Sequence, residues 1–256
     1  TVMIAGALVG AADLLKEKLF RIGAHLLQSA PENTELRDGK IAVKGTASEI
    51  SFADIAMQAH FFRLSFPDRP EYDTGLDANY TYDHPLTTLP SGDGKDLGIF
   101  YPIMGHMCHM PVIEVDIETG RIQFLDYVAV HDCGTMVNPM TLAGHVRGGT
   151  AQGIGTALYE RYDYDSDGQL VNGSYSGYLI PSVYEVPANL RVGHVETPSP
   201  FTEYGIKGGG EGGRMGAPPA IAAAIEDALR PLGVKIDMLP ITPPKLRRLI
   251  REARRA

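Results

Sequence analysis

The stretch from Lys207 to Gly213 holds a single carboxylate, Glu211, with glycines on both sides. Glycine has no side chain, so a bound molecule can approach the backbone here and accept hydrogen bonds from backbone N–H groups. The helix expected after the glycines would add its positive N-terminal end. This arrangement suits a general base that is presented to a bound substrate or cofactor. The alternative is a glycine-rich surface turn with a solvated glutamate.

Nucleotide-binding motifs do not explain this stretch. A phosphate-binding loop of the Walker type ends in Gly-Lys-Ser/Thr, whereas Lys207 precedes the glycines. A dinucleotide fingerprint requires a strand before the glycines and a helix after them, within a βαβ unit. The sequence lacks the alternating strand and helix pattern of such a unit, so neither motif is expected at Lys207–Gly213.

A second unusual stretch runs from Pro139 to Glu160. Its small residues predict a helix, although the stretch contains Gly148, Gly149, Gly153 and Gly155. A glycine in a helix costs about 1 kcal/mol relative to alanine. The glycines therefore indicate that a neighbour approaches the backbone closely. Gln152 lies among them, and its amide either contacts a bound group or hydrogen-bonds a backbone group of its own helix.

Cysteine and histidine usage does not indicate a metal held by side chains. Cys108 and Cys133 are too few for a disulfide scaffold or an iron–sulfur cluster, and they fit a reduced, cytoplasmic setting. Cys133 is interpreted as a small buried structural residue. His106 and His109 flank Cys108, but this spacing lacks the second ligand pair of a zinc site.

Charge and hydropathy exclude two classes of partner. The chain has 256 residues and a net charge of −8, from 23 Lys and Arg against 31 Asp and Glu. An acidic protein repels phosphate backbones, so nucleic acid is not an expected partner. The basic cluster at Lys245–Arg255 is interpreted as a solvated helix face. No apolar run reaches the roughly 18 residues of a membrane-spanning helix, so no membrane span is expected.

The pattern of apolar residues predicts several elements. From Ile4 to Leu26 they recur at spacings of three and four, which predicts an amphipathic helix. A second helix is expected over Phe52–Arg63. Between Ile113 and Val130, apolar and polar residues alternate on both sides of a Thr119-Gly120 turn, which predicts a β-hairpin. Strands are expected over residues 178–186 and 190–196.

A last helix is expected after the glycines of Lys207–Gly213. Pro218 and Pro219 should lie in its first turn, where a missing N–H costs nothing. Ile221, Ile225 and Leu229 would form its apolar stripe.

Three stretches resemble motifs of one family, the molybdenum hydroxylases, to which xanthine dehydrogenase and aldehyde oxidase belong. Lys207–Glu211, with the alanine-rich helix after it, resembles the family's Lys-Gly-x-Gly-Glu motif. His131–Pro139 is similar to the Asp-Cys-Gly-x-x-(Ile/Val)-Asn-Pro segment. Gly148–Glu160 is similar to the Gly-Gly-x-x-Gln-Gly-Ile-Gly-x-Ala-Leu-x-Glu stretch. The three occur in the family's order, and residues 1–30 resemble the segment that follows its pterin-contacting turn.

The resemblance implies roles for particular residues. Glu211 matches the active-site base, and Gln152 matches the glutamine that contacts the pterin or its phosphates. Gly209 and Gly210 would allow the backbone to approach the molybdenum centre. Further cofactor-binding candidates in the matched stretches are Gly153, Lys207 and Thr1. No residue of the chain is expected to be a metal ligand, because the family holds molybdenum through the dithiolene of the pterin.

The resemblance also implies an activity and partners. The activity is oxidative hydroxylation of an aldehyde or an aromatic N-heterocycle, with water as oxygen donor. The cofactor would be molybdopterin cytosine dinucleotide with molybdenum, to which this chain contributes part of the site. Electrons would leave through 2Fe–2S centres and FAD on partner chains. The implied partners are a larger N-terminal molybdenum-subunit chain, an iron–sulfur subunit and a flavin subunit, besides the small-molecule substrate.

The fold implied by the resemblance is α+β, with helices packed on mixed sheets. Residues 1–256 would form the C-terminal part of the molybdopterin-binding region, in which lobes 1–130 and 131–256 can be distinguished. Because part of the cofactor site would come from another polypeptide, the chain is not expected to be stable alone.

Three alternatives remain open. Aerobic carbon monoxide dehydrogenases share Gly-x-Gly-Glu but usually continue with Ser-Pro, where this chain has Gly212-Gly213. An N-terminal-threonine hydrolase would use Thr1 as nucleophile, with its own amine as base. Such folds begin with a strand, whereas a helix is expected here. A non-catalytic assembly subunit is the third alternative, and the presence of Glu211 argues against it.

Overall fold

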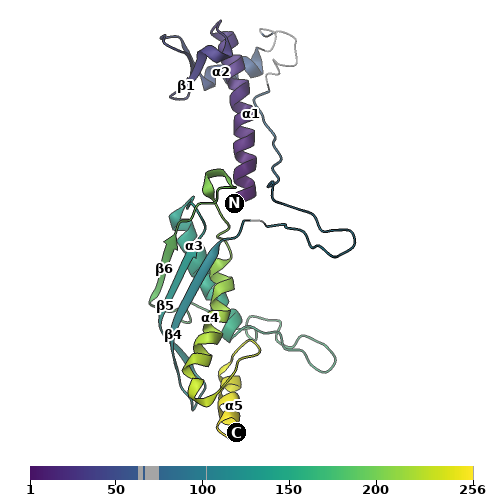
Figure 1. Cartoon of the computed structure of the whole chain (residues 1–256), viewed down its shortest axis with the longest axis vertical. Helices are drawn as coiled ribbons and strands as arrows, with labels where there is room; N and C mark the ends of the chain where they lie inside the picture. Colours follow the sequence, from purple (N-terminus) through teal and green to yellow (C-terminus); the bar gives the residue numbers. More distant parts are fainter. Residues whose placement is uncertain (63–65, 67–74, 102, 256) are drawn as a thin grey trace. The chain divides into compact units, whose positions relative to one another are not determined.

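The computed structural model describes residues 1–62, 66, 75–101 and 103–255. The chain forms two compact units, Thr1–Phe100 and Tyr101–Ala256, each with a sheet and a core of its own (Figure 1). The division therefore falls before the hairpin and not at residue 130. A boundary at 130 would cut the second strand of that hairpin, whose pairing with the first strand spans Ile122–Asp132. The fold is α+β, as the sequence predicted.

The first unit packs two helices against a small antiparallel sheet with strand order β1-β2-β3. Its core joins Ile22, Ile41 and Ile55, which are almost fully buried. The backbone N–H of Asp54 donates to the Ser51 side chain at 3.1 Å, which caps the second helix at its start. The elements are α1 (Val2–Leu26), β1 (Thr34–Arg37), β2 (Lys40–Val43), β3 (Glu49–Ser51) and α2 (Phe52–Phe61). Both predicted helices are confirmed, although the expected end of the second at Arg63 lies outside the described residues.

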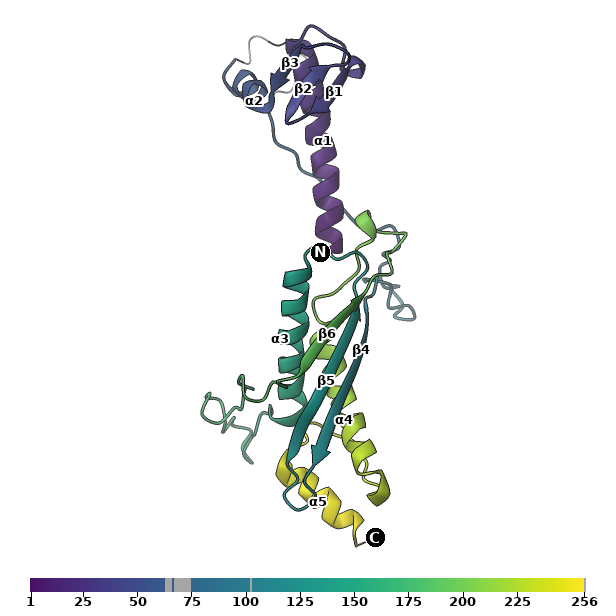
Figure 2. The same cartoon turned by 90° about the vertical axis from the view of Figure 1, so that its left-hand side faces the viewer.

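The second unit has a mixed sheet with strand order β4-β5-β6, and its long helices cover one face (Figure 2). β4 and β5 form the predicted hairpin, and β5 runs parallel to β6. The core lies between sheet and helices and includes Tyr127, Ile154, Ile221 and Ile250. The elements are β4 (His106–Val115), β5 (Ile122–Asp132), α3 (Pro139–Leu158), β6 (Leu190–Val195), α4 (Gly212–Ala228) and α5 (Pro243–Ala253).

The glycines of α3 predicted a close neighbour. For Gly149 and Gly153 that neighbour is α4. A Cβ on Gly153 would lie 2.6 Å from the Cβ of Ala217, and a Cβ on Gly149 would lie 2.9 Å from the backbone nitrogen of Arg214. In the other direction, a Cβ on Gly213 would lie 2.5 Å from the carbonyl oxygen of Val146. Real Cβ atoms do not tolerate such distances, so the two helices approach this closely only because these positions are glycine.

The strand expected over residues 178–186 is absent, and that prediction was wrong. The segment instead turns at Ser182, whose backbone N–H and hydroxyl both donate to the Glu185 carboxylate at 2.7 and 2.6 Å. Pro181 has no N–H to give to a ladder. The strand expected over residues 190–196 is confirmed as β6, Leu190–Val195.

The last helix begins earlier than predicted. α4 starts at Gly212, so Pro218 and Pro219 lie inside it and not in its first turn. The extra turn is stabilised by tertiary contacts, because Gly212 and Gly213 are buried against β5 and α3. Packing of this kind overrides the low helix propensity of glycine. Within the ranges given above, no helix is both long and apolar enough to cross a membrane.

Candidate active site

The three stretches that resemble family motifs meet in the second unit. β5 ends at Asp132, and the backbone N–H of Lys207 donates to the carbonyl oxygen of the next residue, Cys133, at 2.7 Å. Gly134 and Ile206 form an isolated β-bridge beside this bond. Gly209 then passes α3, because a Cβ on it would lie 3.2 Å from Leu142. The glycine-rich loop is therefore bound to the end of β5 before it enters α4.

Glu211 is the N-cap residue of α4 and is exposed. Its backbone carbonyl accepts a hydrogen bond from the N–H of Met215 at 3.0 Å, but its side chain makes no capping bond. Gly210, just before it, has nothing within 4 Å of where a Cβ would be. The carboxylate is thus available to a bound molecule, next to an open stretch of backbone and a helix N-terminus.

The residues on either side of Glu211 are anchored. A Cβ on Gly209 would lie 2.9 Å from the Cβ of Cys133, and a Cβ on Gly212 would lie 2.6 Å from the His131 ring. Between these two contacts, only Gly210 and Glu211 are exposed. The Glu211 position is therefore held by backbone packing, with little freedom to move along the loop.

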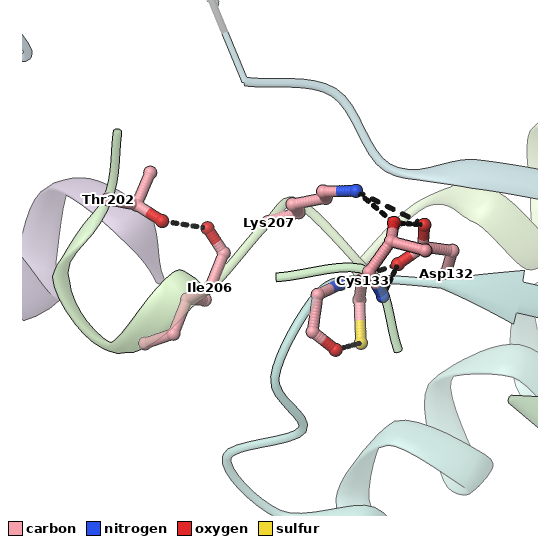
Figure 3. A network of polar contacts seen from close by, with 7 residues as sticks. Asp132, Cys133, Thr202, Ile206 and Lys207 are labelled. Atoms are coloured by element: carbon pink, nitrogen blue, oxygen red, sulfur yellow. Dashed lines mark hydrogen bonds and ion pairs between the residues drawn. The ribbon is translucent and has the colours of Figure 1, made fainter. Parts of the chain in front are cut away.

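Lys207 points into the protein. Its ammonium donates to the Asp132 carboxylate at 3.1 Å and to the Thr197 hydroxyl at 2.6 Å (Figure 3). The two charged side chains are only 12% and 13% exposed. Because Asp132 is the last residue of β5 and Thr197 lies just after the neighbouring β6, this contact ties the start of the loop to the end of the sheet. A cofactor contact by Lys207, which the resemblance implied, stays a prediction.

Gln152 lies on the other face of α3 from α4. Its side chain is exposed and makes no hydrogen bond within the described chain, so the interpretation as an internal cap is not what the structure shows. Gly144 and Gly148 lie two turns and one turn before it, and nothing lies within 4 Å of where their Cβ atoms would be. Residues four apart share a helix face. One face of α3 therefore has two glycines with no neighbour, followed by the exposed side-chain amide of Gln152.

Two further candidates lie elsewhere. Gly153 is buried, and the backbone that approaches it is that of α4. Thr1 is the N-cap residue of α1 in the first unit, and its side chain makes no capping bond. For both residues a cofactor contact stays a prediction. Cys133 is buried, and burial, with the charge of Asp132, raises the pKa of its thiol.

The motif around Cys108 does not form a ligand set. His109 faces the helices, whereas Cys108 is on the opposite face of the same strand, as alternation requires. Over the described part of the chain, no three His, Cys, Asp or Glu side chains gather as they would around a metal ion. A cavity of about 750 Å³ lies near Arg121, Tyr159 and Ile241, and Glu211 and Gln152 do not line it.

A partly buried histidine pair beneath α4 was missed by the sequence reasoning. His109 Nε2 lies 3.0 Å from His131 Nε2, and His109 Nδ1 lies 3.1 Å from the Tyr127 hydroxyl. Gly212 and Gly216 of α4 lie directly on these two rings. Strand alternation could have placed Tyr127 and His131 on one face, but only tertiary structure brings His109 to them.

The pair should make stability depend on pH. Burial, together with neighbouring His109 and His194, lowers the pKa of His131 to about 4, against about 6.5 for an unfolded histidine. Between these values the unfolded chain binds a proton that the folded chain does not. The free energy of unfolding should therefore fall as the pH falls from about 6.5 towards 4. Urea-unfolding midpoints at several pH values measure this slope.

His131→Gln should flatten the slope, since glutamine does not titrate. The matched control is His145→Gln, which removes an exposed histidine from α3. Equal slopes in the wild type and the His131→Gln variant would show that other groups cause the acid sensitivity.

Comparison with known proteins decides the family. Residues 1–187 match the sequence profile of the molybdopterin cofactor-binding domain. The chain belongs to this family. It is 34% identical to the nicotine 6-hydroxylase large subunit of Paenarthrobacter nicotinovorans, over 95% of this chain and 28% of the relative. It is 30% identical to the carbon monoxide dehydrogenase large chain of Hydrogenophaga pseudoflava, over 90% of this chain and 26% of the relative.

A solved structure shares the fold of this family member over nearly its whole length. Quinoline 2-oxidoreductase from Pseudomonas putida 86 has a TM-score of 0.78 and 39% identity, covering 98% of this chain and 30% of the other. The resemblance to molybdenum hydroxylases is therefore confirmed. The chain spans less than a third of the length of each of these three proteins.

The exposed surfaces fit the cofactor of the family. A pterin cofactor needs hydrogen-bond donors for its oxygens and space that no side chain occupies. Gln152 offers an amide donor on α3, and Gly144, Gly148 and, beside Glu211, Gly210 leave space for a ligand, because nothing lies within 4 Å of where their Cβ atoms would be. The described residues thus suit a large ligand that lies against backbone, rather than a metal ion bound by side chains.

Proposed function

We propose that this chain forms part of the active site of a molybdenum hydroxylase, in which Glu211 is the general base. The reaction is oxidative hydroxylation of a small organic molecule with water as oxygen donor. One observation carries the proposal: Glu211 is exposed beside open Gly210, while the residues around this pair are packed against β5 and α3. A solvated glutamate in a loose turn would not need these anchors.

The carboxylate of Glu211 accepts a proton in this reaction. Conversion of a C–H bond and water to C–OH releases two electrons and two protons, so a base beside the reacting oxygen lowers the barrier. The molybdenum cofactor supplies the electron acceptor when it is bound. Anchoring of Gly209 and Gly212 keeps the Glu211 backbone in place through the transfer.

The cofactor would be molybdopterin cytosine dinucleotide, held by α3 and by the glycine loop before α4. The face of α3 with Gly144, Gly148 and Gln152 would take the pterin or its diphosphate, and Gly209 and Gly210 would lie near the molybdenum. Gln152 is free to donate its amide, since its side chain makes no hydrogen bond within the described residues.

Loss of the Gln152 amide should weaken cofactor binding. A hydrogen bond to a charged group contributes about 1.5–3 kcal/mol, or roughly tenfold to a hundredfold in affinity. Gln152→Leu should therefore lower the molybdenum and cytidine nucleotide contents of the purified holoenzyme after dialysis. Gln123→Leu, which changes an exposed glutamine on β5, is the matched control. Full cofactor content in Gln152→Leu would remove this residue from the proposed site.

The substrate class that we favour is an aromatic N-heterocycle. Nicotine 6-hydroxylase and quinoline 2-oxidoreductase, at 34% and 39% identity, are named for nitrogen-containing aromatic substrates. The carbon monoxide dehydrogenase large chain is less similar, at 30%. Single-turnover reduction of the holoenzyme by quinoline, an aldehyde or carbon monoxide distinguishes the three classes. Reduction by carbon monoxide alone would overturn the substrate assignment.

The partners would be the remainder of the molybdenum subunit, an iron–sulfur subunit and a flavin subunit, in the cytoplasm. The chain spans less than a third of its relatives, and Cys108 and Cys133 are too few to hold a cluster. Electrons would therefore leave through centres that lie outside these 256 residues. Mass spectrometry of the chains that co-purify with this one tests the assignment, and an assembly without an iron–sulfur protein would contradict it.

A further inference from the structure

A partly buried network joins the loop that carries Glu211 to the sheet. The Asp132 carboxylate accepts from the backbone N–H groups of Gly134 and Thr197 at 2.8 and 3.2 Å, and from the Thr197 hydroxyl. Its fourth partner is the Lys207 ammonium, at 3.1 Å. Burial raises the pKa of Asp132, but these hydrogen bonds outweigh it and hold the pKa below its usual range. Asp132 is therefore charged at neutral pH, and Lys207 balances that charge.

The network fixes the first residues of the loop in three ways. The Lys207 side chain reaches Asp132 at the end of β5, and its backbone N–H donates to Cys133 at 2.7 Å. One residue earlier, the carbonyl of Ile206 accepts from the Thr202 hydroxyl at 2.7 Å (Figure 3). Glu211 lies four positions after Lys207, and the three glycines between them have no side chains with which to hold a conformation. The position of the carboxylate thus depends on this network together with the packing of Gly209 and Gly212.

We propose that Lys207 is a positioning residue for Glu211: paired with Asp132, it sets the path of the glycine loop and so the place of the catalytic carboxylate. This inference rests on the proposed function of Glu211. It assigns Lys207 an internal partner instead of a cofactor oxygen. The ammonium already has two partners within 3.1 Å, and its side chain is 12% exposed.

The test compares Lys207→Met with Glu211→Gln and with the double variant, all as holoenzyme. A displacement of about 1 Å at a catalytic group can cost about a hundredfold in rate. Lys207→Met should therefore slow single-turnover reduction by substrate about tenfold to a hundredfold, with KM nearly unchanged. In the Glu211→Gln background the same substitution should change the rate less than about twofold, because residues that act through one another are not additive.

A second variant and a matched control protect the test against loss of folding. Lys207→Met leaves the Asp132 charge buried without its counter-ion, so Asp132→Asn with Lys207→Met should restore the melting temperature and keep the rate defect. Lys235→Met removes an ammonium that pairs with Glu226 and is 81% exposed, and it should change nothing measurable.

The outcomes separate the alternatives. A low molybdenum content in Lys207→Met would show that Lys207 binds the cofactor and would overturn the inference. If Lys207→Met lowers the melting temperature but leaves the rate per bound molybdenum unchanged, the Lys207–Asp132 pair only stabilises the fold, and the inference is overturned. Additive losses in the double Lys207→Met and Glu211→Gln variant would show that Lys207 acts independently of Glu211. If Glu211→Gln alone keeps the wild-type rate, the proposed function fails first, and that result is distinguishable from the others.

Discussion

Glu211→Gln is expected to retain the fold and the molybdenum content while losing most turnover. Glutamine has the same shape, and the Glu211 side chain makes no capping bond whose loss would disturb α4. It cannot accept a proton, and removal of a general base costs about 100- to 10,000-fold. The loss should appear in the rate at which substrate reduces the metal in a single turnover, because that step contains the proton transfer.

The matched control is Glu203→Gln, which neutralises another exposed glutamate in the segment before the glycine loop. It should reduce its metal at the wild-type rate. Melting temperature and metal content are measured on both variants, so that a folding defect is not taken for a chemical one. A Glu211→Gln variant with nearly wild-type reduction would show that this glutamate is only part of a loop.

Gly213→Ala is expected to destabilise the second unit, because its new Cβ would clash with backbone atoms of α3, which cannot change rotamer as a side chain can. It would lie 2.5 Å from the carbonyl oxygen of Val146 and 2.9 Å from the backbone nitrogen of Thr150. α3 and α4 would have to separate, and overpacking of this kind costs about 1–3 kcal/mol. The melting temperature should fall by roughly 2–4 °C for each kcal/mol. Because α4 begins beside Glu211, the rate of substrate oxidation should fall as well.

Gly144→Ala makes the same substitution where nothing lies within 4 Å of the added Cβ. Alanine has the better helix propensity by about 1 kcal/mol, so this variant should melt at the wild-type temperature or above it. Equal melting temperatures for Gly213→Ala and Gly144→Ala would mean that the α3–α4 contact is not close-packed.

Local patterns in the sequence were sufficient for much of the fold and for the central residue of the site. The spacing of apolar residues predicted α1, α2 and the β4–β5 hairpin, because the period of a helix or strand is a local property. The small residues of 139–160 predicted α3. The isolation of Glu211 among glycines pointed to a base, since backbone without side chains is informative by itself. The resemblance of three ordered motifs then placed these residues in one family.

Other features depended on contacts between residues far apart in the chain. Lys207 and Asp132 are 75 positions apart, and no periodicity relates a lysine before a glycine loop to the last residue of a distant strand. His109 and His131 meet only because β4 and β5 pair in one register. The start of α4 at Gly212 likewise required β5 and α3 to pack against two glycines that favour no helix.

The glycines of α3 show what local sequence predicts and what tertiary structure adds. Their number in the sequence implied a close neighbour, but not which face that neighbour takes. In the structure, Gly149 and Gly153 receive α4, while Gly144 and Gly148 stay open in line with Gln152. Sequence alone determined that this helix has several positions without a side chain and a close neighbour. Only tertiary packing decided which side is core and which remains free for a ligand, because burial is a property of the neighbours and not of the glycine itself.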